Sequence, residues 1–390
     1  MIDVYTRLAR ALDKLPHGYP AADDGVHLEI LRRIFSPKDA AMTLRLKPVP
    51  EPVEVIARRV RRPPDEVKTD LDAMADKGQI FKLRMRGVEH YAMAPFVIGI
   101  WEFQLNSLDR EMAELFERYA PTLLTTLGGH EPALVRVVPV NKRIDARAEI
   151  MRYDDLRQIL ASCNSFRVAE CICRKEMDLL GKPCNHTREA CMSFARAADA
   201  YEGMPEWGRE VTREEALELL DRCEEEGLVH NTYNTQGEPY FVCNCCSCCC
   251  GLLRALNEYD APYMIARSNY VAEIDVDSCT VCGVCEDGER CPVNAITEVE
   301  DDVFAVDGVR CLGCGVCAVG CEYDAIQLVE RPEAEQRTPP KSIVRWSLDR
   351  TDHRKGRLAG AAMRGWVAWE GLKMAGRRRA QKSAAPKRAS

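Results

Sequence analysis

The sequence lacks the long apolar runs that mark membrane and secreted proteins. No stretch reaches about 18 uninterrupted apolar residues, which predicts no transmembrane helix. Residues 1–25 contain no continuous apolar segment, so we expect no secretory signal peptide. The 390 residues, 46% hydrophobic and 29% charged, are typical of a globular chain with roughly two to four domains. We therefore expect a cytoplasmic protein, with a peripheral position on the inner face of the membrane as the alternative.

Two common kinds of enzyme site are also missing. No G-x-G-x-x-G follows a predicted strand, so we expect no dinucleotide site. No set of Ser, His and Asp residues suggests nucleophilic catalysis. We therefore assign no catalytic residue, and we favour an electron-transfer subunit or carrier over a stand-alone enzyme.

Cysteine, in contrast, is abundant and unevenly distributed. Nineteen of the twenty cysteines follow residue 170, many only two or three positions apart. Disulfide scaffolds are usually short chains with scattered cysteines. Neighbours this close suit a shared metal centre and are mostly too near for an unstrained disulfide. The distribution therefore predicts metal-bound cysteines.

Residues 276–330 contain an internal duplication built on C-x2-C-x2-C. It resembles the bacterial two-cluster ferredoxins over roughly 55 residues, in which each half supplies three thiolates to one 4Fe–4S cluster and a fourth to the other. Applied to this chain, the resemblance implies a first cluster on Cys279, Cys282, Cys285 and Cys321, and a second on Cys291, Cys311, Cys314 and Cys317.

Two positions depart from the ferredoxin pattern. Five residues rather than three separate Cys285 from Cys291, and Cys321 is followed by Glu322 rather than proline. We expect both departures to bend a loop without removing a ligand. A zinc-binding repeat is the alternative, but eight cysteines in this doubled order disfavour it.

A second cysteine field lies upstream and offers more thiols than one cubane needs. Three interpretations remain open: one or two further 4Fe–4S clusters, which we favour; a zinc site that His186 would join; or a redox-active thiol or unusual cluster. We expect some of these thiols not to be ligands. The candidates are Cys171, Cys173, Cys184, Cys191, Cys243, Cys245, Cys246, Cys248, Cys249 and Cys250. Cys163 and Cys223 stand alone, and we expect Cys223 to serve only packing.

Residues 27–97 show the element order of a winged helix, with three predicted helices followed by two short strands. The candidate recognition helix is acidic, because Asp65, Glu66, Asp70, Asp72 and Asp76 outnumber Lys68 and Lys77. An acidic helix repels the phosphate backbone that supplies most DNA affinity. We therefore disfavour DNA as a partner and expect this unit to contact protein.

The charge is divided between an acidic body and a basic end. Residues 341–390 hold 14 Lys and Arg against 3 Asp and Glu, a net charge of +11. Because the whole chain has a net charge of −7, the other residues carry a net charge of −18. The proline- and charge-rich composition of residues 331–342 predicts a linker. The pattern of residues 358–375 predicts a moderately amphipathic helix. We expect residues 341–390 to contact an acidic partner or an anionic membrane surface, with a solvated disordered end as the alternative.

These observations predict an α+β multidomain chain. Over about residues 25–335 it resembles the 4Fe–4S dicluster proteins of anaerobic bacteria, which place a winged helix and a CxCR…CNCCxCCC region before the ferredoxin module. The resemblance implies electron transfer to a partner oxidoreductase. Alternatives are an iron–sulfur redox sensor that binds DNA and a catalytic thiol or disulfide redox subunit. The expected divisions are an N-terminal helix or arm (1–26), a winged helix (27–97), a cysteine-rich α+β domain (98–265), a two-cluster ferredoxin domain (266–330), and a linker with a basic amphipathic tail (331–390).

Overall fold

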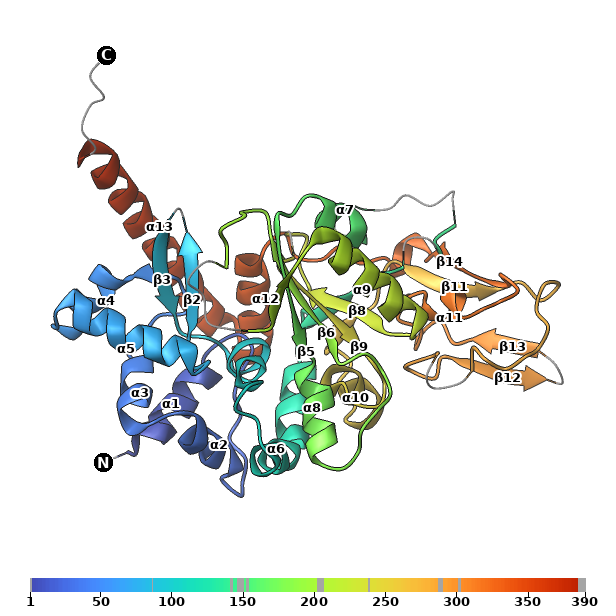
Figure 1. The fold of residues 1–390 in the computed structure, drawn as a ribbon, viewed down its shortest axis with the longest axis horizontal. Helices are drawn as coiled ribbons and strands as arrows, with labels where there is room; N and C mark the ends of the chain where they lie inside the picture. Colours follow the sequence, from blue (N-terminus) through green and yellow to red (C-terminus); the bar gives the residue numbers. More distant parts are fainter. Residues whose placement is uncertain are drawn as a thin grey trace, which may run out of the picture.

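The computed structural model of the chain is of mixed α/β class (Figure 1). A sheet in the middle separates a mainly helical end, which carries both termini, from an end of small two-stranded sheets. The structure describes residues 2–85, 87–140, 143–145, 151, 154–201, 207–237, 239–286, 290–300 and 303–384, without the side chains of 300 and 374–384.

The N-terminal part holds the helices and hairpin that the sequence predicts. Strand β3 pairs with both β1 and β2, and Pro64 opens α5 after the break at Pro63. A further short helix, α3, lies between the first two predicted helices. The winged-helix interpretation itself stays a prediction. The elements are α1 (Val4–Asp13), α2 (Val26–Ile34), α3 (Pro37–Thr43), β1 (Glu51–Pro52), α4 (Val53–Val60), α5 (Pro64–Asp76), β2 (Phe81–Met85) and β3 (Val88–Ala92).

The central sheet has seven strands in the order β10-β4-β8-β9-β6-β5-β7. Its neighbours are antiparallel, except that β10 runs parallel to β4. β8 and β9 are consecutive strands that pair as an antiparallel hairpin. The strands are β4 (Val135–Val137), β5 (Ser165–Glu170), β6 (Glu189–Ala195), β7 (Arg209–Val211), β8 (Val229–Tyr233), β9 (Phe241–Cys245) and β10 (Ile265–Ala266).

Helices cover the two faces of this sheet (Figure 1). Thr212 and Glu215 form a capping box that opens α9. Helices α7 and α9 pack with β5 and β6 around a small hydrophobic cluster that includes Cys163 and Cys223, so both lone cysteines are packed in this cluster. The helices here are η1 (Phe96–Ile100), η2 (Glu102–Gln104), α6 (Arg110–Gly128), α7 (Leu156–Ala161), α8 (Ile172–Leu179), α9 (Arg213–Glu225) and α10 (Gly251–Glu258).

The ferredoxin-like part consists of two antiparallel strand pairs and one short helix. β11 pairs with β14, which joins the start of the segment to its end, and β12 pairs with β13. Part of the longer loop between Cys285 and Cys291 lies outside the described residues. The elements are β11 (Tyr270–Ile274), β12 (Ile296–Glu300), β13 (Val303–Val306), α11 (Val316–Val319) and β14 (Ile326–Glu330).

The segment after residue 330 differs from the expected linker and tail. It forms η5 (Glu333–Glu335), α12 (Ile343–Lys355) and α13 (Arg357–Ala384), and Trp346 of α12 is fully buried. The large hydrophobic core runs from Leu8 to Trp346 and includes residues of every predicted division. Residues 331–355 therefore belong to the folded body, because burial of Trp346 fixes α12 against it. No helix in the described part of the chain is both long and apolar enough to cross a bilayer.

Arg350 is the polar anchor of α12. Its side chain is fully buried and donates hydrogen bonds to the carbonyl oxygens of Pro16, Leu127, His130 and Pro132. Burial lowers the pKa of this guanidinium to about 9. One side chain thus ties α12 to the end of α6 and to the loop after α1.

Arg350→Gln should lower the free energy of unfolding by about 3 kcal/mol, because it leaves several buried carbonyls unpaired. Arg345→Gln on the same helix is the matched control. Its side chain is 65% exposed and pairs with Asp349, so its loss should cost under about 1 kcal/mol. Denaturant midpoints of the two variants measure the difference, and equal midpoints would contradict the anchoring role.

Candidate metal centres

The structure groups the ferredoxin cysteines by fours. Cluster site 1 is the group around Cys285: burial raises the pKa of this thiol to about 11, and the neighbours that raise it further are Cys279, Cys282 and Cys321. These are the four residues that the ferredoxin resemblance assigns to one cubane. Residues from both ends of the segment meet here because β11 and β14 pair.

Cluster site 2 comprises Cys291, Cys311, Cys314 and Cys317. Burial raises the pKa of Cys314 to about 12, and Cys311 and Cys291 add to the effect. Cys317 responds to the same neighbours. The backbone N–H of Ala295 donates to the Cys291 sulfur at 3.0 Å. Four converging thiols with such a donor fit a 4Fe–4S cluster, whose assembly has to displace their protons.

The two sites differ in exposure. Cys282 of cluster site 1 is exposed and its other three thiols are half-buried, whereas all four thiols of cluster site 2 are buried. Cluster site 2 lies against the central domain, where the Val140 N–H donates to the Cys314 carbonyl at 2.9 Å. Site 1 is thus the outer site and site 2 the inner one.

Gly313 explains how the second cysteine loop lies so close to β11. Its φ is +66°, and a Cβ atom here would sit 2.1 Å from the carbonyl oxygen of Tyr270. Only glycine accepts both conditions without displacing backbone.

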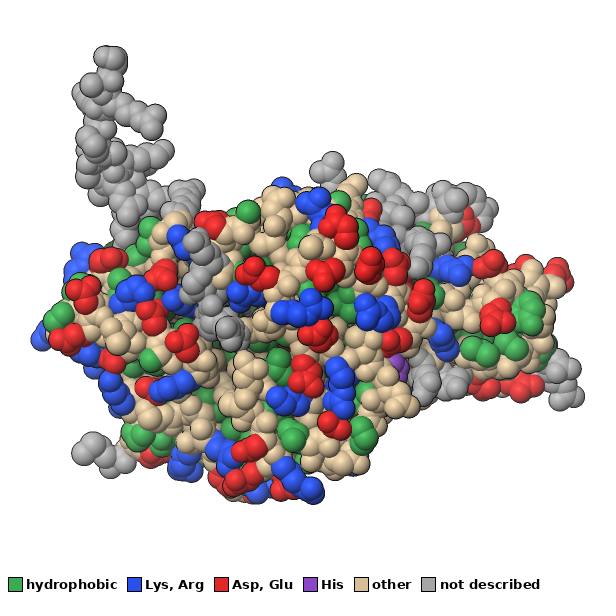
Figure 2. Space-filling model, in the orientation of Figure 1, with side chains coloured by type: hydrophobic (Ala, Val, Ile, Leu, Met, Phe, Trp, Pro, Cys, Tyr) green, Lys and Arg blue, Asp and Glu red, His purple; other side chains and the backbone are tan. Residues whose placement is uncertain are grey.

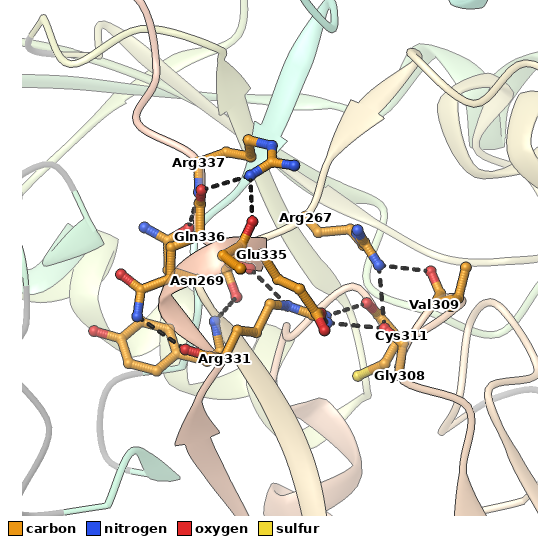
Figure 3. Close-up of polar contacts among 12 residues, drawn as sticks. Arg267, Asn269, Gly308, Val309, Cys311, Arg331, Glu335, Gln336 and Arg337 are labelled. Atoms are coloured by element: carbon orange, nitrogen blue, oxygen red, sulfur yellow. Dashed lines mark hydrogen bonds and ion pairs between the residues drawn. The ribbon is translucent and has the colours of Figure 1, made fainter.

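Arg331 also supports the second cysteine loop (Figure 3). Its guanidinium donates to the carbonyl oxygens of Cys311 at 2.6 Å, Gly308 at 2.8 Å and Ser268 at 3.1 Å. Arg267 donates to the Gly308 carbonyl as well, at 3.1 Å. The first residue of the expected linker is therefore a structural support of cluster site 2.

The upstream cysteines assemble through strand register. Cys191 of β6 lies directly opposite Cys243 of β9, and Cys171 follows the end of β5, the other neighbour of β6. Cys173 contacts both Cys171 and Cys250. The six-cysteine group defined by these contacts contains Cys171, Cys173, Cys191, Cys243, Cys245 and Cys250.

Electrostatics within this group favour thiolate at Cys171. Contacts with Cys173 and Cys191 hold the pKa of Cys171 well below its usual range, and Arg174 adds to the effect. None of the six thiols is exposed. Such a shielded set of thiols fits an iron–sulfur cluster.

A second, tighter group lies beside the first. The ligand atoms of Cys184, His186, Cys246 and Cys248 all lie within 4.8 Å of one another. Cys249 contacts both Cys246 and Cys248 of this mixed cysteine–histidine group, and its sulfur lies 3.7 Å from that of Cys248, but it is not one of the four ligands. The upstream cysteines thus fall into two neighbouring groups.

Arg174 lies between these two groups and was not among the residues predicted from the sequence. Its buried guanidinium donates to the carbonyls of Thr187 and Asn244, and its charge acts on both Cys171 and Cys246. Its position directly after Cys173 in the CxCR motif was the available signal. A buried cation here favours thiolate in both groups.

Comparisons with known proteins support an iron–sulfur, ferredoxin-like module. The chain is 34% identical over 71 residues to "Electron transport protein HydN" of Escherichia coli K12, covering 17% of this chain and 40% of that protein. It is 31% identical over 80 residues to a probable iron–sulfur protein of the Frd operon of Proteus vulgaris, covering 20% and 50%. It is 39% identical over 54 residues to "Dihydromethanopterin reductase (acceptor)" of Methanosarcina mazei, covering 14% and 23%.

These similarities are local, since the chain spans half or less of the length of each of these relatives. No family model matches the chain. No solved structure matches it.

The grouping of the ferredoxin thiols predicts opposite results for two double variants. Cys285→Ala/Cys321→Ala removes two thiols from cluster site 1 and should leave cluster site 2 intact, with about four irons of the module retained. Cys285→Ala/Cys291→Ala removes one thiol from each site and should damage both. Iron content and EPR spin integration of anaerobically purified protein measure this. If Cys285→Ala/Cys291→Ala kept one intact cluster and Cys285→Ala/Cys321→Ala lost both, the grouping would be wrong.

Proposed function

We propose that this chain is an iron–sulfur electron-transfer protein. It exchanges single electrons with a partner oxidoreductase at cluster site 1 and relays them through cluster site 2 to a third cluster in the six-cysteine group. A 4Fe–4S cluster bound at such thiols accepts and returns one electron at a time. The observation that carries the proposal is the exposure of the cysteines, which falls from site 1 to site 2, together with the helix that joins site 2 to the six-cysteine group.

That helix is α10. Cys250 of the six-cysteine group is its N-cap residue. Near its other end, the Asn257 side-chain amide donates to the carbonyl of Pro292 at 2.9 Å, next to Cys291 of cluster site 2. A rise of about 1.5 Å per residue places these two ends roughly 10 Å apart. The chain thereby holds the two thiol groups at a short, fixed separation suited to electron transfer.

The surface around cluster site 1 suits a basic partner. Residues 266–330 contain 14 Asp and Glu against 3 Lys and Arg, a net −11. Figure 2 shows acidic side chains gathered around the end of the molecule that β12 and β13 form. An acidic surface beside the outer site attracts and orients a partner with a complementary positive patch. The names of two relatives, an electron transport protein and a probable iron–sulfur protein, agree with this role.

The other predicted contacts stay proposals. Arg62 in the expected winged helix donates to Asp70 at 2.6 Å, which reduces the charge available to DNA phosphate and favours a protein contact there. On α13, Leu358, Trp369 and Leu372 are exposed, as a surface-binding helix requires. The side chains of the basic residues from 377 to 388 lie outside the described residues.

Iron analysis tests the third cluster. Full-length protein purified without oxygen should hold about twelve irons per chain, eight of them in the ferredoxin module. Cys171→Ala/Cys191→Ala should lower this to about eight without changing the ferredoxin EPR signals. Cys223→Ala, a buried thiol outside both groups, is the control and should leave iron unchanged. A wild-type content of about eight would remove the six-cysteine group from the electron path.

Charge reversal tests the docking surface. Asp277→Lys/Glu322→Lys changes two exposed acidic residues near cluster site 1 and should slow reduction of a basic cytochrome c several-fold at low salt. Glu54→Lys/Glu114→Lys, which changes exposed residues of α4 and α6, is the matched control. Stopped-flow rates at low and high salt provide the measurement. Equal, salt-independent rates for all three proteins would contradict an electrostatic docking site here.

A further inference from the structure

We propose that Cys184, His186, Cys246 and Cys248 form a binding site for a single tetrahedral zinc ion. This mixed cysteine–histidine group would be separate from the iron–sulfur sites. It would hold in place the cysteine loops that precede β6 and follow β9, and it would not carry electrons, because zinc has no redox chemistry. The inference goes beyond the proposed electron transfer and stands independently of it.

Interatomic distance is the first argument. All four ligand atoms lie within 4.8 Å of one another. A tetrahedral zinc ion, with bonds of about 2.3 Å to sulfur and 2.0 Å to nitrogen, brings its ligand atoms to about 3.8 Å or less from one another. A cubane binds each thiolate through a different iron, which spreads the four sulfurs further apart. The group therefore matches one ion better than a four-iron cluster.

His186 is the second, independent argument. Its Nδ1 atom is shielded from solvent and has no hydrogen-bond partner among the described residues. A buried polar atom without a partner costs about 1–3 kcal/mol. A metal ion removes this cost, because a neutral imidazole nitrogen is a common metal ligand. Three thiolates and one imidazole make a closed, four-coordinate set of the structural zinc type.

The backbone presents these ligands from two anchored loops. Cys184 and His186 lie in the loop between α8 and β6, and Cys246 and Cys248 directly follow β9. The Thr187 N–H donates to the Glu226 carboxylate at 2.7 Å, and Arg174 donates to the Thr187 carbonyl at 2.6 Å. Each loop thus supplies two ligands, and an ion bound between them would cross-link the anchored α8–β6 loop to the end of β9.

The position also favours metal entry. Cys246 is buried, Cys184 and His186 are half-buried, and Cys248 is exposed. Zinc can therefore reach the site from solvent, whereas the six-cysteine group beside it exposes no thiol.

Zinc X-ray absorption on anaerobically purified full-length protein tests the proposal without any substitution. We expect about one zinc per chain, bound by three sulfurs at about 2.3 Å and one nitrogen at about 2.0 Å. His186→Cys should keep the zinc and change the set to four sulfurs, and Cys223→Ala should change neither. Absence of zinc, or a four-sulfur set in the wild type with Cys249 in place of His186, would overturn the proposal.

Iron content separates this proposal from the proposed function. Cys184→Ala/Cys248→Ala should remove zinc while leaving iron and the EPR signals unchanged. If that variant lost about four irons instead, the mixed group would belong to an iron–sulfur cluster and the zinc proposal would fall, while electron transfer would stand. Conversely, zinc present with only eight irons would leave this proposal standing and remove the third cluster.

Discussion

The pairing of β6 with β9 is the constraint on which the upstream sites depend. It sets Cys191 directly opposite Cys243 and brings the strand-end cysteines from residues 171 to 250 into one place. A slip of one residue would turn these side chains to the other face of the sheet. Hydrophobic packing of α7 and α9 in one cluster and of α6 and α10 in the other favours that register. Ordinary strand pairing thus positions the thiols in space.

The cysteine groups also differ in their exposure to solvent. Exposure falls from Cys282 at the outer end to the buried thiols of cluster site 2, and α10 then leads to Cys250. Burial disfavours negative charge on the thiolates of each site. Arg174 in the upstream groups and the Ala295 N–H at cluster site 2 offset this effect. In the proposed function, a surface-facing site, an inner site and a connecting helix would form the electron path.

Local sequence signals predicted most secondary structure here, because caps, turns and strand periodicity act over a few residues. Thr212 and Glu215 have the spacing of a capping box at the start of α9, and the ferredoxin resemblance of the doubled C-x2-C-x2-C implied two sets of four thiols. Contacts between residues far apart in the chain could not be predicted from these local signals. Nothing near Trp346 or Arg350 indicates that they pack against residues over 200 positions away, so residues 331–342 were predicted to be a linker and α12 was assigned to the tail. The split of the upstream cysteines also depends on register, which one sequence does not encode locally.

The central claim is that the thiol groups are close enough to act as one electron path. EPR of the fully reduced, full-length protein tests this most directly, because reduced clusters at such separations broaden each other's signals. We predict about three spins per chain with clear magnetic interaction, and loss of part of that interaction in Cys171→Ala/Cys191→Ala. Spins that behave as isolated centres, unchanged by that variant, would contradict the claim.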